Sequence, residues 1–108
     1  GAKAIILGVT FKENCPDIRN SKVIDVHNEL VSYGLDVDVF DPWASAEEVK
    51  HELSIDLVQE LKINYSLIVL AVSHREFSEM NVLNQLIENG IVYDVKSFLP
   101  KTMVTSRL

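Results

Sequence analysis

Three short, mainly apolar runs constrain the fold of this chain more than any other feature. They lie at Ala4–Leu7 (AIIL), Ser66–Val72 (SLIVLAV) and Ile91–Val95 (IVYDV). A strand with one exposed face alternates apolar and polar residues, whereas continuous apolar runs are typical of strands covered on both faces. Stretches of helical periodicity separate these runs. The sequence therefore predicts a parallel sheet with right-handed helical crossovers.

The other elements follow from periodicity and from residues that start or stop helices. Asn20 or Ser21 is the expected N-cap of the first helix, and Gly34 is expected to end it. We expect one domain, 1–108, with a doubly wound, three-layer Rossmann-like α/β fold and a mainly parallel sheet. The tail 101–108 has no clear assignment. The predicted elements are strand 3–9, loop 10–19, a helix up to Gly34, strand 35–40, helix 45–52, a short strand 55–57, a helical turn 58–63, strand 66–72, helix 80–89 ended by Gly90, and strand 91–95.

Composition argues against several classes of protein. Apolar residues make up 47% of the 108 residues and charged residues 24%, which is ordinary for a globular domain. No apolar run approaches the roughly 18 residues of a membrane span, and Gly1-Ala2-Lys3 leads into the first strand without a signal-peptide pattern. The net charge of −6 argues against nucleic-acid and anionic-membrane partners. The single cysteine, Cys15, excludes an internal disulfide and fits a reducing cytoplasm.

The loop after the first strand carries side chains where a dinucleotide-binding protein carries glycines. Residues 8–21 read GVTFKENCPDIRNS, so the fingerprint that brings a dinucleotide close to the backbone is missing. Arg19 precedes a helix N-terminus, which favours an anion, although an ion pair with Asp17 explains it equally well. Lys12 beside Phe11 suits a diphosphate clamp with the ring over a sugar or base. A core phenylalanine and a solvent lysine are the alternative.

Polar and aromatic residues follow each predicted strand. In an open α/β sheet, ligands bind at the carboxyl ends of the strands, so these loops are expected to converge on one crevice. The residues are Phe11, Lys12 and Arg19 after the first strand, Asp41 and Trp43 after the second, His74 and Arg75 after SLIVLAV, and Lys96 and Ser97 after IVYDV.

Three reactive residues are expected to be structural. No histidine adjoins Cys15 in sequence, and Pro16 favours an extended backbone before it, which does not suit a catalytic nucleophile. His74 is expected to be a packed or hydrogen-bonded loop histidine. Asp41 ends a strand where dinucleotide folds place a ribose-binding acid. Without the glycine fingerprint, turn formation before Pro42 is the preferred interpretation.

The stretch GVTFKENCPDIRNSKVIDV, followed at matching distances by VDVFDPWA, LIVLAVSHREF and YDVKSFLP, resembles the C-terminal UDP-binding domain of the UDP-glucose/GDP-mannose dehydrogenase family. The F-K-x-x-x-x-D-x-R-x-S core is specific, and the resemblance is collinear over nearly the whole chain. The segment KENCPDIRNS is most similar to that of the family branch that oxidises UDP-N-acetylhexosamines for bacterial surface polysaccharides.

The resemblance implies a longer cytoplasmic enzyme, forming a homodimer or larger homo-oligomer, that oxidises a sugar C6 alcohol to a carboxylate with NAD. NAD is then bound mainly by a domain absent from this chain. Phe11 and Lys12 resemble the pair that contacts the UDP-sugar, and Arg19 resembles the arginine that reaches the NAD of the neighbouring domain. Lys96 falls where relatives often have a substrate-contacting arginine, and a lysine lacks its bidentate fork. No catalytic or metal-binding residue is expected in this chain.

Two other interpretations are compatible with an α/β fold. A non-catalytic nucleotide-binding or regulatory module would share the same crevice. A phosphoacceptor receiver domain requires an acidic pair directly after the first strand, where this chain has Val9 and Thr10. The receiver interpretation is therefore disfavoured.

Overall fold

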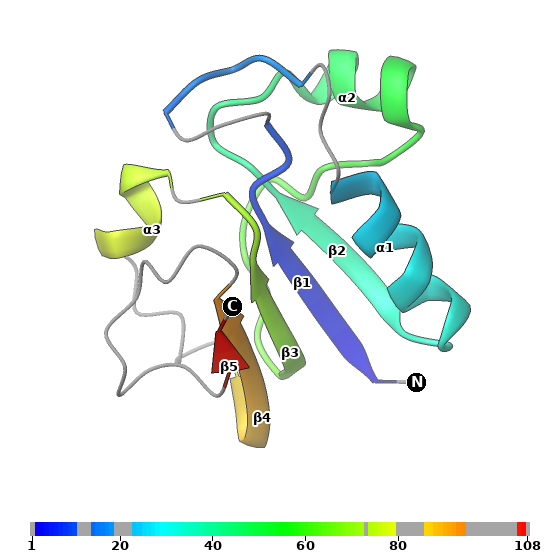
Figure 1. Ribbon diagram of the computed structural model, residues 1–108, viewed down its shortest axis with the longest axis vertical. Helices are drawn as coiled ribbons and strands as arrows, with labels where there is room; N and C mark the ends of the chain where they lie inside the picture. Colours follow the sequence, from blue (N-terminus) through cyan, green and yellow to red (C-terminus); the bar gives the residue numbers. More distant parts are fainter. Residues whose placement is uncertain are drawn as a thin grey trace.

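The computed structural model describes residues 2–10, 14–18, 23–72, 74–79, 86–94 and 106–107 (Figure 1). These residues form one sheet with helices against both faces. None of the helices among them is both long and apolar enough to cross a membrane. The elements, in chain order, are β1 (Lys3–Leu7), α1 (Val23–Ser32), β2 (Asp36–Phe40), α2 (Ala46–Leu53), β3 (Tyr65–Leu70), α3 (Arg75–Glu79), β4 (Leu86–Asp94) and β5 (Ser106–Arg107).

The sheet has the strand order β2-β1-β3-β4-β5, and each neighbouring pair is parallel. The chain passes from β1 outward to β2 and then returns across β1 to β3. The order of the strands therefore reverses between β1 and β3, which is the topological switch point where open α/β sheets place their ligands. The predicted mainly parallel, Rossmann-like sheet is confirmed.

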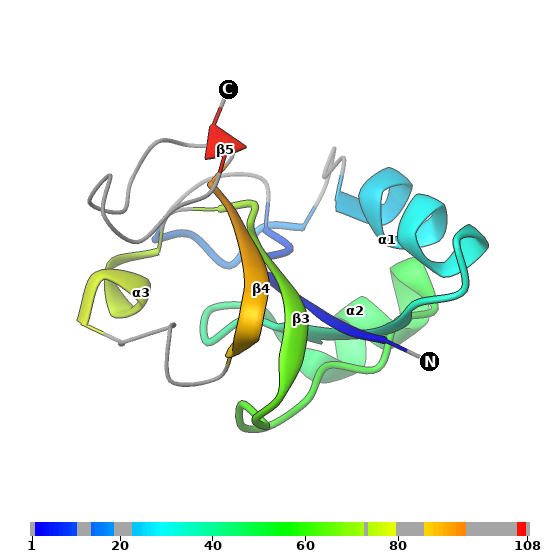
Figure 2. The ribbon, with the colours of Figure 1, turned by 90° about the horizontal axis from the view of Figure 1, so that it is seen from below.

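Two clusters of buried side chains fill the space on the two faces of the sheet. Neighbouring strands place residues of one face in register, as with Ile6 opposite Val39 and Val69. That face packs against Val23 of α1 and Val49 of α2, whereas the other face packs against Phe77 of α3. Figure 2 shows the same division, with α1 and α2 to the right of the sheet and α3 to the left. Both faces are covered, as the continuous apolar strands predict.

Helices α1 and α2 begin and end near the predicted positions. Helix α2 has Ser45 as its N-cap, whose hydroxyl accepts a hydrogen bond from the Glu48 N–H at 3.2 Å. Gly34 follows α1 with φ +85°, and its N–H donates to the Val31 carbonyl at 2.9 Å. The predicted N-cap of α1, Asn20 or Ser21, lies outside the described residues.

The segment between α2 and β3 corrects two predictions. In place of a strand at 55–57 there is a single parallel bridge between Leu57 and Val39. In place of a helical turn at 58–63 the chain bends, because its N–H groups bond elsewhere. The Val58 N–H donates to the Val39 carbonyl at 2.9 Å, and the Lys62 N–H donates to the Tyr65 hydroxyl at 3.3 Å.

The predicted helix 80–89 is wrong over its second half. Residues 86–90 belong to β4, which begins at Leu86 opposite Tyr65. A register irregularity after that pair brings Ile91 opposite Leu67 and accommodates the extra residues of β4. Pairing with a buried neighbour strand has overridden the local helical periodicity. The first part of that prediction, residues 80–85, lies outside the described residues. A short helix, α3, precedes it and directly follows His74.

Candidate functional site

The carboxyl ends of β1, β2 and β3 approach one another closely. The Gly8 N–H donates to the Phe40 carbonyl at 2.9 Å, and the Ala71 N–H donates to the Leu7 carbonyl at 3.0 Å. Gly8 has φ +98°, and a Cβ placed on it would lie 2.6 Å from the Cβ of Val72. Only glycine adopts this positive φ without strain and has no Cβ to overlap with Val72. The loops that follow β1, β2 and β3 therefore begin close together, at the topological switch point between β1 and β3.

Asp41 is the centre of this edge. Asp41 is 6% exposed, and its carboxylate accepts hydrogen bonds at both oxygens. Burial raises the pKa of this carboxyl, but the hydrogen bond from His74 and those from backbone N–H groups outweigh burial, so the pKa is lowered. The donors are the N–H groups of Val9 (2.7 Å) and Thr10 (3.2 Å) and Nε2 of His74 (2.9 Å) at Oδ2, and the N–H groups of Trp43 (2.7 Å) and Ala44 (3.0 Å) at Oδ1.

His74 is fully buried beside this carboxylate, and its partners fix the tautomer of the ring. The Asn14 N–H donates to Nδ1 at 2.8 Å, so Nδ1 carries no proton. The proton is on Nε2, which donates to Asp41 Oδ2 at 2.9 Å and lies 3.0 Å from the Thr10 hydroxyl oxygen. The imidazole is therefore a neutral connector between three loops. The predicted hydrogen-bonded loop histidine is confirmed.

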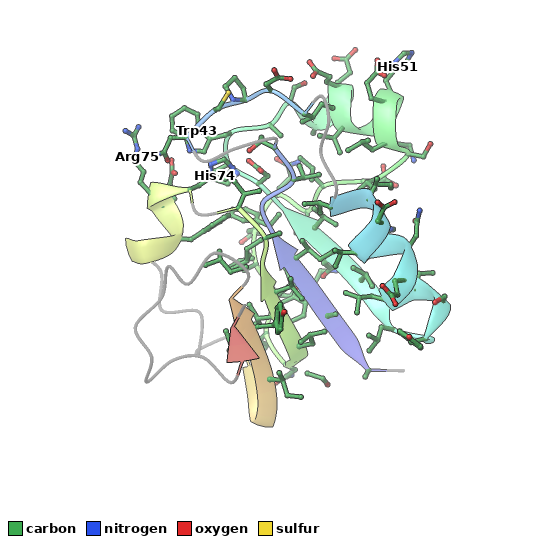
Figure 3. The ribbon with its side chains drawn as sticks, in the orientation of Figure 1. Trp43, His51, His74 and Arg75 are labelled. Carbon is green, nitrogen blue, oxygen red and sulfur yellow. The ribbon has the colours of Figure 1, made fainter. Side chains whose placement is uncertain are left out.

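An aromatic and charged rim surrounds the buried pair (Figure 3). The Trp43 ring stacks on the His74 ring with 6.0 Å between centroids, and its Nε1 donates to Glu76 Oε1 at 2.7 Å. That hydrogen bond lowers the pKa of the Glu76 carboxyl. The Arg75 guanidinium lies 5.1 Å from the Trp43 ring centroid, within cation–π range. His51, on α2, lies away from this group and is exposed.

The expected convergence of loops is confirmed for the described parts of three of them. Asp41, Trp43, His74 and Arg75 come together, with Asp41 forming the predicted turn as well as the buried bonds. The remaining candidates, Phe11, Lys12, Arg19, Lys96 and Ser97, lie outside the described residues. Cys15 is half-buried and forms no disulfide.

Sequence reasoning missed Thr10, Asn14 and Glu76 as members of this edge. For Asn14 the signal was the residue type, because asparagine tolerates a positive φ better than most residues, and the structure gives Asn14 a φ of +54°. Its side-chain oxygen accepts from the Arg75 N–H at 2.8 Å. Thr10 and Glu76 had no local signal, since their partners lie 64 and 33 residues away in the chain.

The described ends of β1 and β2 do not form a dinucleotide cradle. The second glycine of the fingerprint G-x-G-x-x-G lets the backbone approach a pyrophosphate, and two residues after Gly8 this chain has Thr10 in its place. Asp41, at the position of a ribose-binding acid, directs both oxygens to N–H groups of the protein. Within the described part of the chain, no group of three or more His, Cys, Asp or Glu side chains is arranged to hold a metal ion.

The sequence pattern of a known domain matches almost all of this chain. The profile of the UDP-glucose/GDP-mannose dehydrogenase family, UDP binding domain, matches residues 5–101. The chain belongs to this family. The resemblance inferred from the motifs is thereby confirmed.

Several curated members of the dehydrogenase family are similar over the whole chain. UDP-N-acetyl-D-glucosamine 6-dehydrogenases of Salmonella typhi and Pseudomonas aeruginosa are 45% and 44% identical to it, over 100% of this chain and 26% of each relative. Protein CapL of Staphylococcus aureus is 42% identical over 92% of this chain and 24% of its own length. The chain thus spans about a quarter of the relatives it matches.

Solved structures of the dehydrogenase family have the same fold. The UDP-N-acetyl-mannosamine dehydrogenase Cap5O of S. aureus superposes with a TM-score of 0.73 at 19% identity, over 99% of this chain and 25% of that one. A UDP-glucose dehydrogenase of Pyrobaculum islandicum superposes with a TM-score of 0.72 at 21% identity, over 99% and 24%. At this level of identity the likeness concerns the fold.

Proposed function

We propose that this chain is the C-terminal, UDP-sugar-binding domain of a longer NAD-dependent nucleotide-sugar dehydrogenase. The intact enzyme oxidises the C6 alcohol of a UDP-N-acetylhexosamine to a carboxylate, for bacterial surface polysaccharide synthesis. The observation that carries this proposal is the 45% identity to a UDP-N-acetyl-D-glucosamine 6-dehydrogenase over the full length of the chain. The match to the UDP binding domain of the family supports it.

In this proposal the crevice lies at the carboxyl edge of the sheet. Phe11, Lys12 and Lys96 contact the UDP-sugar, and Arg19 reaches the NAD held mainly by a neighbouring domain. A protein with net charge −6 attracts an anionic ligand only through local cations, and these residues provide three of them. The absence of a G-x-G-x-x-G fingerprint from the sequence after β1 supports the assignment of NAD to another domain. We propose that the intact enzyme is a homodimer or larger homo-oligomer.

The proposal is tested in the intact enzyme with Lys12→Ala and Arg19→Ala. NADH formation is followed with UDP-N-acetylglucosamine, UDP-N-acetylmannosamine and UDP-glucose. We expect Arg19→Ala to raise the KM for NAD by about tenfold to hundredfold, the effect of losing a charge-assisted hydrogen bond. In this proposal Lys12 faces solvent until UDP binds, so we expect Lys12→Ala to reduce the thermal stabilisation by UDP and to leave the ligand-free Tm nearly unchanged, since surface substitutions cost about 0.5 kcal/mol or less.

A lysine outside the crevice provides the control. Lys50 on α2 is exposed and bonds Asp56 at 3.1 Å. Lys50→Ala should therefore change neither the KM for NAD nor the thermal stabilisation by UDP. Absence of NADH with every UDP-sugar would refute the proposed activity. An unchanged UDP-induced shift in Lys12→Ala would remove Lys12 from the site. An unchanged KM for NAD in Arg19→Ala would favour the alternative, an ion pair with Asp17.

A further inference from the structure

One imidazole ring holds both ends of the loop segment that contains Phe11 and Lys12. Nε2 of His74 lies 3.0 Å from the hydroxyl of Thr10, the residue that precedes this segment. Nδ1 accepts from the N–H of Asn14, the residue that follows it, at 2.8 Å. Since one planar ring contacts both residues, the entry and exit of segment 11–13 are fixed relative to each other.

Both ends are secured by further hydrogen bonds. The Thr10 N–H donates to Asp41 Oδ2 at 3.2 Å. The Asn14 side chain accepts from the Arg75 N–H at 2.8 Å. His74 itself has little room to move, since it is fully buried between the rings of Trp43 (6.0 Å) and Phe77 (5.6 Å). Asp41, bonded to Nε2, orients the ring in turn. The arrangement is more than packing requires, because the two ring nitrogens contact the two ends of a single loop, with the Nε2 proton shared between Asp41 Oδ2 and the Thr10 hydroxyl oxygen.

We propose that His74 is a positioning residue for nucleoside-diphosphate-sugar binding, acting by clamping the two ends of segment 11–13. This inference rests on the proposed function, in which Phe11 and Lys12 contact the ligand. A loop whose ends are already fixed loses less conformational freedom when ligand binds, and that difference appears directly in affinity. His74 is buried and touches no ligand itself.

The test uses three variants of the intact enzyme. His74→Leu removes both clamp contacts at similar volume. Thr10→Val is a milder change that removes only the hydroxyl at the entry end. Val49→Ala is the control, because Val49 is equally buried but packs in the cluster on the α1 and α2 face of the sheet and is not among the described contacts of His74. All variants are studied well below their Tm, where each is fully folded by circular dichroism.

Two readouts are measured, the Kd for UDP and hydrogen–deuterium exchange of peptides that contain residues 10–14. We expect His74→Leu to weaken UDP binding about tenfold and to accelerate exchange in 10–14 about tenfold relative to β1, the size of effect that a lost hydrogen bond produces. Thr10→Val should show smaller changes of the same sign. Val49→Ala should lower the Tm and leave both readouts within about twofold, since the clamp contacts remain.

The outcomes separate the clamp, the positioning role and the proposed function. Faster exchange in 10–14 together with weaker UDP binding supports the proposal. Unchanged exchange in His74→Leu, or in Thr10→Val where His74→Leu does not fold, overturns the clamp. Faster exchange with unchanged Kd overturns the positioning role, and so does a Val49→Ala enzyme that loses UDP affinity equally. Failure of the wild-type enzyme to bind UDP overturns the proposed function and the positioning role with it, while the exchange data still decide whether the clamp exists.

Discussion

At the scale of single residues, the hydrogen bonds that Asp41 accepts from the described part of the chain all come from N–H donors. Both carboxylate oxygens act as acceptors, at Oδ2 toward Val9, Thr10 and His74 and at Oδ1 toward Trp43 and Ala44. An ionised carboxylate suits this environment because it is acceptor-only. An asparagine amide does not, since in either orientation its NH₂ group would face backbone N–H groups. This position therefore requires a side chain with two acceptor oxygens.

We expect Asp41→Asn to lower the free energy of unfolding at pH 7 by roughly 2–4 kcal/mol, the cost of leaving buried N–H groups without an acceptor. Urea denaturation of the wild type and the variant measures the difference. Asp56→Asn is the control, because the Asp56 side chain is 80% exposed and bonds only Lys50 among the contacts seen. A loss below about 0.5 kcal/mol in Asp41→Asn, the level of a surface substitution, would contradict the role assigned to the carboxylate.

The lowered pKa of Asp41 also fixes the direction of a pH dependence. The folded pKa lies below the ordinary value of 3.8, so the unfolded chain binds a proton first as the pH falls. The stability contributed by Asp41 is therefore complete above that value and is lost as the pH drops through the folded pKa. In Asp41→Asn this contribution is absent, and the loss of stability below pH 3.8 should be shallower than in the wild type.

At the scale of secondary-structure elements, the approach of β1 to β3 depends on Gly8. Alanine there meets two obstacles, the φ of +98° and the Val72 backbone nitrogen and Cβ, which a side-chain rotation cannot move. Gly34 separates the two effects, because its φ is +85° but nothing lies within 4 Å of an added Cβ.

Gly8→Ala should therefore destabilise the protein more than Gly34→Ala. For Gly34→Ala we expect a loss of about 1–2 kcal/mol, the cost of a left-handed backbone without glycine. For Gly8→Ala the overlap with Val72, two residues after β3, adds about 1–3 kcal/mol, as in an overpacked core. Thermal and urea unfolding of both variants measure this. Equal losses would show that Val72 moves away from residue 8 without cost.

How far the sequence predicts an element depends on where its hydrogen bonds go. α1 and α2 satisfy their N–H groups locally, with Ser45 and Gly34 at their ends, so local rules predict them. The bend after Leu57 and the strand at Leu86 depend on partners in β2 and β3, which periodicity does not reveal.

The same distinction holds at the candidate site. The sheet topology predicts that Asp41, Trp43 and His74 meet, because they follow parallel strands. The double contact of His74 with Thr10 and Asn14 depends on ring orientation, which follows from burial between two other rings. Phe11, Lys12, Arg19 and Lys96 remain predictions from the family motif.

At the scale of the whole molecule, the chain spans about a quarter of its relatives and contributes one side of a shared crevice in our proposal. We expect the 108-residue chain alone to form no NADH from NAD and any UDP-sugar, because its sequence lacks the glycine fingerprint of a dinucleotide-binding loop. The assay is run beside the intact enzyme as a positive control. NADH formation by the chain alone, abolished by Cys15→Ser, would contradict both this expectation and the structural role of Cys15.

The bonds around Asp41 and His74 also bear on the order in which the chain folds. They join residues that are far apart in sequence, with Val9 and Asp41 32 residues apart and Thr10 and His74 64 apart. Contacts of this kind form only after long loops have closed, so they are slow to appear during folding. The helices α1 and α2 do not depend on them. The edge proposed to receive the nucleotide is therefore completed late, and a chain that has formed its helices but not its full sheet offers the ligand no place to bind.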